Sequence, residues 1–380
     1  MSTIAQNLQT IATAKADIAT SVNAKGGNIT SSTPLSAYSA AIDALPSGGG
    51  GGEPDWSEIG YSGAPQNILD AFDYSKTIYA NWDDTQTNLA GKFSGDTQLI
   101  YMPLVDTSSA TNMSNMLSGC TRLEYMPLIN TSGVTDMGSM FRSCSKITTI
   151  PQLNTSACTS MLSMFRDCSN LTTIPQLNTS NVEYAQDMFY NCSSLVAIPL
   201  LDTSKVKDMG SMFRSCSKIT TIPQLNTSAC TNMPSMFYGC THITTIPQLN
   251  TSGVTDMGGM FQTCSSLGKI EGLDFTSYIY DSSIFGTSNN NSIKYALFKN
   301  IGTPSGRTTY QFNRATNWGV ADSTYTDARD SLVDSLLTYS FDRATAGYST
   351  CTIKLSSNSK NQLTAQEISD IEAKGYTITT

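Results

Sequence analysis

A repeat of 24 residues is the feature of this sequence that most limits its fold. Cysteine recurs at that interval, and a column of prolines runs in step with it. The column cysteines are Cys120, Cys144, Cys168, Cys192, Cys216, Cys240 and Cys264. The segment "SKITTIPQLNTSAC" occurs at 145–158 and again at 217–230, which indicates that three units were copied together. Such a period is typical of proteins in which each unit buries its apolar side against its neighbours.

Each unit has two halves with different apolar patterns. The first half, such as "KITTIPQL" at 146–153, is rich in β-branched residues and favours a short strand that ends near the proline. The second half, such as "TDMGSMFRSC" at 135–144, places apolar residues at i, i+3, i+4 and i+7, which favours a helix of about two turns. We therefore predict an α/β repeat fold, a right-handed solenoid with one strand and one short helix per rung.

A polar triplet links the two halves of every unit. It consists of Asn or Asp followed by Thr-Ser, and its first residues are Asp106, Asn130, Asn154, Asn178, Asp202, Asn226 and Asn250. Such side chains bond the backbone of turns. The Asn-Thr-Ser triplets also match the acceptor pattern for N-linked glycosylation. Because the column persists where Asp replaces Asn, the structural interpretation is favoured.

The consensus of the units resembles the BspA-type leucine-rich repeats, a family also described as a mycoplasma-lipoprotein repeat domain. The segments "NTSGVTDMGSMFRSC" (130–144) and "DTSKVKDMGSMFRSC" (202–216) carry the resemblance, which covers roughly residues 75–290. It implies a leucine-rich-repeat solenoid that provides a surface for binding rather than a reaction. Such repeats occur on bacterial surface proteins, in some protists and in phages.

The flanks of the repeats resemble segments of phage tail proteins. The opening "IAQNLQTIATAKADIATSVNAKGGNIT" is similar to the helical N-terminal segment of tail and tail-fibre proteins. The ending "LTAQEISDIEAKGYTIT" is similar to segments that flank these repeats in predicted tail proteins of phages of gut bacteria. The resemblance implies a virion protein at the phage tail, and a bacterial cell surface is the alternative location.

An apolar stripe near the N-terminus is the predicted docking site. It comprises Ile4, Leu8, Ile11, Ile18 and Val22, at heptad-like spacing. A lone helix of this length is marginal in water. Its apolar face therefore needs a partner, which is either a second helix at about 35–45 or another protein. Other virion proteins are the expected partners in the second case, and self-association into a homo-oligomer is a further option.

The composition shifts along the chain predict five regions. They are a helical docking or oligomerisation segment (1–46), a Gly-rich linker (47–54), an N-terminal cap (55–96), the repeats (97–288) and a small α/β capping region (289–380). The linker is a flexible tether. In the last region we predict a helix at 327–341, a strand at 350–356, a helix that starts in a capping box at Thr364 and stops at Gly375, and a final strand.

Charge and hydropathy exclude several classes of function. The net charge is −8, with only 14% charged residues and no basic run. Nucleic-acid binding and binding to anionic membranes need clustered Lys and Arg, so neither is expected. No apolar segment is long enough for membrane insertion. No secretory signal follows Met1, which favours a phage protein assembled inside its host over an exported adhesin.

No motif in the sequence points to catalysis, and this includes its many acidic residues, which give no sign of a paired-carboxylate site. It has none of the phosphate-binding, nucleophile or zinc-protease motifs, and a single histidine, His242, at an exposed strand position. We therefore predict that the protein is not an enzyme and has no cofactor and no metal site. The cysteines are expected to be free, buried thiols, with Cys158 and Cys230 replacing the valines of other units.

The candidate binding residues follow the phenylalanine of each unit. They are Arg142, Arg166, Tyr190, Arg214 and Tyr238, here named the Arg/Tyr ridge. Stacking of the units would align them, and Arg and Tyr are favoured at recognition surfaces. The alternative is an ordinary solvated face. The exposed strand positions, such as Thr148, Thr149 and Gln152, form a second candidate face, or else a ladder that stabilises the sheet.

These features predict a tail-associated phage protein whose repeats attach it to the host without covalent chemistry. The predicted partner is a protein or a glycan of the host surface. A bacterial adhesin and a structural virion decoration without a receptor are the two alternatives.

Overall fold

The computed structural model describes residues 83, 85–102, 105–279, 283–286, 292–301, 309–312, 314–315, 317–320, 326–340, 342–346 and 349–380. The chain divides into two compact units, Met1–Asp84 with Pro103–Thr107, and Thr85–Met102 with Ser108–Thr380. The second unit contains the repeats and the C-terminal elements. The predicted docking residues Ile4, Leu8, Ile11, Ile18 and Val22 and the Gly-rich linker lie outside the described residues.

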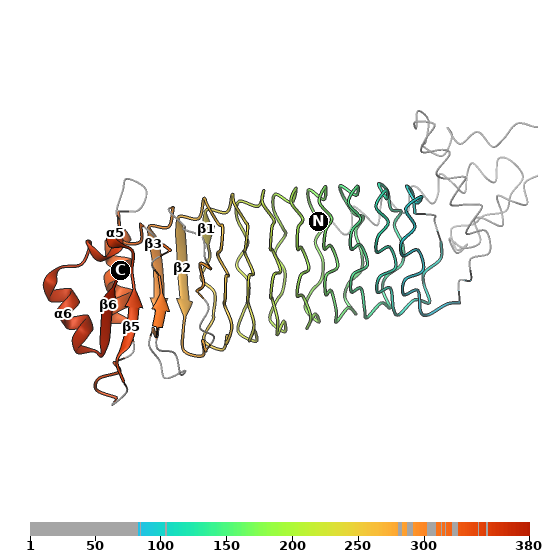
Figure 1. Cartoon of the computed structure of the whole chain (residues 1–380). Helices are drawn as coiled ribbons and strands as arrows, with labels where there is room; N and C mark the ends of the chain where they lie inside the picture. Colours follow the sequence, from blue (N-terminus) through green and yellow to red (C-terminus); the bar gives the residue numbers. More distant parts are fainter. Residues whose placement is uncertain are drawn as a thin grey trace, which may run out of the picture. The chain divides into compact units, whose positions relative to one another are not determined.

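The repeats of the second unit are coils that follow one another in parallel register (Figure 1). Isolated parallel bridges join residues 24 positions apart, in one continuous column. The column runs through Asn88, Asn112, Asp136, Ser160, Tyr184, Asp208, Asn232 and Asp256. Strand β1 (Thr245–Ile246) pairs in the same parallel register with β2 (Lys269–Asp274). The predicted repeat fold, with one unit per coil, is confirmed.

The core of the stack is built from columns of identical residues. The Met, Phe and Cys columns of the units are buried, as predicted. The Phe rings from Phe141 to Phe261 lie face to face, with neighbouring centroids between 5.5 and 6.0 Å apart. Phe285 extends the series with a tilted ring at 6.2 Å. Each coil therefore supplies one layer to a continuous apolar core, which no single unit could form.

The second half of each unit is not the predicted short helix. Residues 137–144 form consecutive turns, in which, for example, the N–H of Met140 donates to the carbonyl of Met137 at 3.1 Å. Alternate N–H groups donate to carbonyls of the next coil, and in this unit they belong to Met137, Ser139, Phe141 and Ser143. Amides that are used between coils cannot make the i to i−4 bonds of an α-helix. The turns nevertheless bury the same positions as a helix would.

Two columns of left-handed residues produce these turns. One column includes Ser139 (φ 56°) and the other Ser143 (φ 61°). The second column holds Gly95, Gly119, Ser143, Asp167, Asn191, Ser215, Gly239 and Thr263, all with positive φ. A left-handed conformation costs a residue with a side chain about 1–2 kcal/mol, and glycine avoids this cost. The small and polar residues of these columns therefore mark the turns.

Substitutions at Ser215 should test the left-handed backbone. We expect Ser215→Gly to raise the free energy of unfolding by up to about 1 kcal/mol, because the Cβ penalty disappears. Ser215→Val should lower it by about 1–3 kcal/mol, because a β-branched residue is strained at positive φ. Chemical denaturation measures both variants. A destabilising Gly variant, or equal effects of Gly and Val, would show that this residue is not left-handed.

The first half of each unit is only partly the predicted strand. Among the described units that keep the proline, a strand forms only at β1, with one further bridge between Tyr101 and Tyr125. In other coils the backbone contact is slight, as where Thr172 N–H donates to the carbonyl of Thr148 at 3.0 Å. The proline of each unit has no N–H with which to extend a ladder. A regular parallel sheet appears where the proline column ends, from β1 through β2 to β3 (Tyr295–Lys299).

The C-terminal elements form a second parallel sheet. Its order is β4 (Thr309–Gln311), β5 (Cys351–Lys354) and β6 (Tyr376–Thr379). Strands β5 and β6 confirm the strands that were predicted there. The predicted helix at 327–341 is α4 (Ala328–Val333), continued by the π-helical turn η2 (Asp334–Thr338).

Two helices lie between β5 and β6. The short helix α5 (Ser357–Lys360) was not predicted from the sequence. Helix α6 (Ala365–Ala373) begins in the predicted capping box, in which Thr364 and Glu367 bond each other's backbone N–H groups. It is followed by Gly375 at φ 91°, so the predicted stop is confirmed. Across the described part of the chain, no helix has the length and apolar character needed to cross a bilayer.

Candidate binding surface

Four of the five ridge residues stack on one another across successive coils. The Cζ atom of Arg166 lies 4.4 Å from the centroid of the Tyr190 ring. The Cζ atom of Arg214 lies 5.5 Å from the same ring and 4.3 Å from the ring of Tyr238. Each residue follows a core phenylalanine, so the stacking of the Phe column aligns them. The fifth residue, Arg142, is exposed and has no such ring contact with a described residue.

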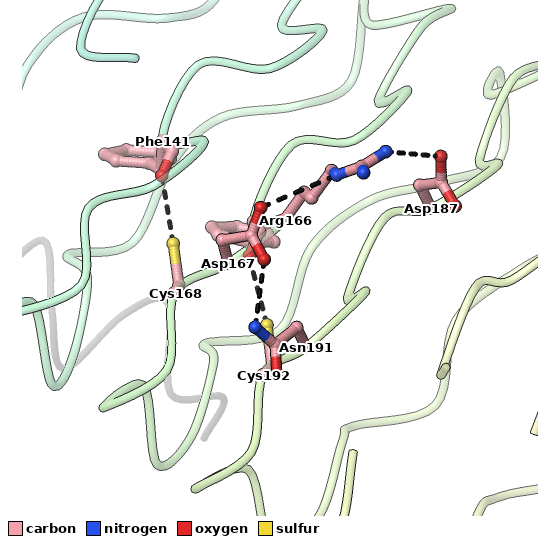
Figure 2. Close-up of polar contacts among 8 residues, drawn as sticks. Phe141, Arg166, Asp167, Cys168, Asp187, Asn191 and Cys192 are labelled. Atoms are coloured by element: carbon pink, nitrogen blue, oxygen red, sulfur yellow. Dashed lines mark hydrogen bonds and ion pairs between the residues drawn. The ribbon is translucent and has the colours of Figure 1, made fainter. Parts of the chain in front are cut away.

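Acidic and amide side chains that the sequence did not single out surround Arg166 (Figure 2). Its Nη1 lies 3.0 Å from Asp187 Oδ2, and its Nε lies 3.6 Å from Asp167 Oδ2. Asn191 Nδ2 donates to Asp167 Oδ1 at 3.0 Å. All three partners occupy the left-handed columns. Most other units have Ser or Gly at these positions, so the presence of Asp and Asn was the available sequence signal.

The ridge is electrostatically uneven along its length. Burial raises the pKa of the Asp187 carboxyl, and this effect exceeds the opposing attraction of the Arg166 and Arg214 guanidinium groups. The contact with Arg166 therefore supports the ionised form of a carboxylate that is partly removed from water. Arg166 is held by two carboxylates, whereas Arg214 has no ion pair with any described residue.

The cysteine column lies beneath the ridge and is part of the core. The Sγ of Cys168 donates to the carbonyl of Phe141 at 2.9 Å (Figure 2), and the Sγ of Cys192 to that of Phe165 at 3.0 Å. All ten cysteines are buried, as predicted. Burial raises the pKa of the Cys192 thiol, which keeps it protonated. Within the described ranges no three His, Cys, Asp or Glu side chains are grouped closely enough to hold a metal ion.

The Asn-Thr-Ser column has the predicted structural role. Asn154 Oδ1 accepts from the backbone N–H of Ser156 at 3.1 Å and from its hydroxyl at 2.8 Å. The Thr131 hydroxyl donates to the carbonyl of Asn154 in the next coil at 2.9 Å. Where Asp202 replaces Asn, its carboxylate accepts the equivalent bond from Ser204. The column therefore closes a turn and ties neighbouring coils together.

The strand face offers fewer free polar groups than its sequence indicates. Gln152 Nε2 donates to the carbonyl of Gln176 at 2.6 Å, and Gln176 Nε2 to that of Leu200 at 2.7 Å. These glutamines therefore join adjacent coils. The exposed threonines of this face, such as Thr148 and Thr149, lie beside them. His242 is exposed, as predicted.

The stacked coils define this chain as a repeat protein with an ordered polar ridge on a uniform core. It belongs to the family described as "Mycoplasma protein of unknown function, DUF285", whose model matches residues 87–200 and 196–296. The predicted resemblance to the mycoplasma-lipoprotein type of repeat is thereby confirmed at the family level.

Two solved structures of repeat proteins show a likeness to the chain. A leucine-rich repeat protein of T. pallidum matches with 17% identity and a TM-score of 0.23, over 52% of this chain and 78% of that one. The functional domain of InlJ from Listeria monocytogenes, which includes a cysteine ladder, matches with 12% identity and a TM-score of 0.13, over 58% and 66%. No curated protein matches the chain. Because both TM-scores are low, the family assignment depends on the sequence match.

Proposed function

We propose that the repeats form a non-covalent binding surface through which a tail-associated phage protein attaches to its host. The observation that carries this proposal is the ridge, in which Arg166, Tyr190, Arg214 and Tyr238 stack in sequence. Stacking holds the guanidinium planes in fixed orientations, which lowers the entropy lost on binding. The core columns are nearly uniform, whereas the ridge varies from coil to coil, as a surface that selects a partner would.

Membership of the repeat family fits a role in binding or adhesion. The phage context is supported by a separate observation, which is the resemblance of both flanks to segments of phage tail proteins. The proposal includes a right-handed leucine-rich-repeat solenoid as the scaffold. It also includes docking on other virion proteins through the apolar stripe near the N-terminus. The same stripe could instead join copies of this chain into a homo-oligomer. Catalysis, cofactors, nucleic acid and membrane insertion form no part of it.

A bacterial cell-surface adhesin is the second candidate function. The family match favours it, because the description of that family names a mycoplasma protein rather than a phage. A structural virion decoration without a receptor is the third candidate, and a ridge that only clamps neighbouring coils would favour it.

Mass spectrometry of particles purified from a lysate of the source culture separates these candidates. The phage proposal predicts stoichiometric recovery of peptides from 1–45 and from the repeats together with the particles. Recovery from bacterial envelopes alone would reject the phage context and leave the adhesin. If the protein is recovered with the particles, but particles that lack it adsorb to the host equally well, only the structural virion decoration remains.

A further inference from the structure

We propose that the partner of this surface is a linear acidic polysaccharide, whose carboxylates bind along a basic edge of the repeat stack. This inference rests on the proposed binding function and names the class of ligand. The basic edge consists of Arg122, Arg142, Lys146, Arg166, Arg214 and Lys218.

The edge is formed by two cationic columns on either side of a tight bend. In one coil Arg142 precedes the bend and Lys146 follows it. The bend contains the left-handed Ser143, and Ser145 N–H donates to the carbonyl of Ser143 at 2.9 Å. Four residues of chain span at most about 14 Å, so the two columns run close together along the stack.

The spacing of the coils sets the spacing of the cations. Neighbouring Phe rings beneath the edge lie 5.5 to 5.7 Å apart between Phe141 and Phe237. Arg142 and Arg166 lie in adjacent coils, as do Arg122 and Lys146, so the cations of each pair are separated by about one coil spacing. A linear polymer with regularly repeated carboxylates can meet several of them at once, and such multivalent contact raises avidity. A compact ligand with one charge would use only one coil.

Most of the cations on this edge are free to bind an anion. Arg122, Arg142, Lys146 and Lys218 are exposed, and none makes an ion pair with a described residue. Among the described residues, Arg122 donates only to the neutral Gln98 Oε1, at 3.3 Å. In the part of the chain that the structure describes, the carboxylates that pair with a cation of the edge are Asp167 and Asp187, and both hold Arg166. The edge is thus locally positive on a chain whose net charge is −8.

The ridge chemistry favours a glycan over a nucleic acid. Single-stranded nucleic acids stack their bases on open aromatic rings. The Tyr190 ring instead contacts Arg166 from the coil before it and Arg214 from the coil after it, so its faces are taken. The guanidinium groups of Arg142 and Arg214, which form no ion pair with a described residue, remain available. Such groups bind carboxylates through paired N–H groups. The amide of Asn191 and the carboxylate of Asp167 add donors and acceptors for sugar hydroxyls.

Binding to polygalacturonate, with one carboxylate per sugar, tests this proposal on the full chain. The variant with Arg142→Gln and Lys146→Gln should bind about tenfold more weakly or worse, because two charge-assisted contacts are lost. The matched control carries Lys205→Gln and Lys207→Gln. It removes the same charge from lysines that already contact Asn181 and Glu183, and its affinity should change less than about twofold. Neutral dextran should not bind.

Equal losses in the two variants, or tighter binding of single-stranded DNA than of polygalacturonate, would overturn the acidic-glycan proposal. If the wild-type protein is retained on bacterial envelopes but does not bind polygalacturonate, only the proposed class of ligand is wrong. If it binds neither the envelopes nor polygalacturonate, the proposed binding function is wrong as well.

Discussion

Raising the pH from about 8 to about 10 should unfold the repeat stack. Burial raises the pKa of nine thiols, from Cys120 to Cys264, above the ordinary value of 9.0. The pKa is about 11 for Cys158 and Cys230 and about 12 for Cys216. Between pH 9 and these values, the unfolded chain releases thiol protons that the folded chain keeps. The free energy of unfolding therefore falls as the pH rises, and the stabilisation is complete only below about pH 9.

The expected loss is comparable to the whole stability of a typical domain. One pH unit above its unfolded pKa, each thiol lowers the free energy of unfolding by about 1.4 kcal/mol. Nine thiols together give about 13 kcal/mol at pH 10, against the 5–15 kcal/mol of most proteins. Urea denaturation at a series of pH values, with a reductant present, measures the slope.

Valine at two of these positions is the matched control for the thiol effect. Other units hold valine where Cys158 and Cys230 lie, so Cys158→Val with Cys230→Val should leave the fold intact. The variant should lose about two ninths of the alkaline slope, because two of the nine titrating groups are gone. A slope that is unchanged in this variant, or a wild-type protein that is stable at pH 10, would show that the thiols are not buried in this way.

Phe189→Ala should be among the most destabilising single substitutions in the repeats. Its ring is fully buried and lies 5.6 Å from each of the rings of Phe165 and Phe213. Removal leaves a cavity between two layers that cannot close without shifting the coils, at a cost of about 3–5 kcal/mol. Leu200→Ala is the control. That side chain is 63% exposed, so its loss should cost less than about 0.5 kcal/mol.

Thermal and chemical denaturation of these two variants compares the buried and the exposed site. Similar losses at Phe189 and Leu200 would contradict a stack with a continuous Phe core. A cavity effect that is confined to the neighbouring coils, seen as faster amide exchange there, would agree with the near-independence of distant units in repeat proteins.

The sequence predicted the burial pattern of the repeats better than their backbone. Met137, Met140, Phe141 and Cys144 are buried as the i, i+3, i+4, i+7 spacing required. That spacing cannot distinguish a helix from consecutive turns, because both bring the same positions to one side. The column that includes Ser143 distinguishes turns from a helix, because most of its residues are Gly, Asn, Asp or Ser, and all have positive φ. This column becomes visible only after the units are aligned, and it indicates turns only if a left-handed backbone is considered.

The ridge was predictable only in part for a similar reason. Alignment of the units places Arg166, Tyr190, Arg214 and Tyr238 in one column, and the structure confirms that they are neighbours. The ion pair between Arg166 and Asp187 joins different columns of adjacent coils. Such a diagonal contact depends on the offset between coils and on side-chain direction, neither of which the repeat period determines.

Sedimentation of the labelled protein with bacterial envelopes tests the binding role of the ridge most directly. On envelopes that retain the wild-type protein, the amount of this protein in the pellet is compared with that of a ridge variant. The ridge variant carries Arg142→Gln and Arg214→Gln. The control variant carries Lys205→Gln and Lys207→Gln, which removes the same charge outside the ridge, and circular dichroism checks that both variants are folded. We predict that the ridge variant is lost from the pellet and the control is retained. If the ridge variant is retained, the ridge has no binding role. The same conclusion follows if no envelope retains even the wild-type protein.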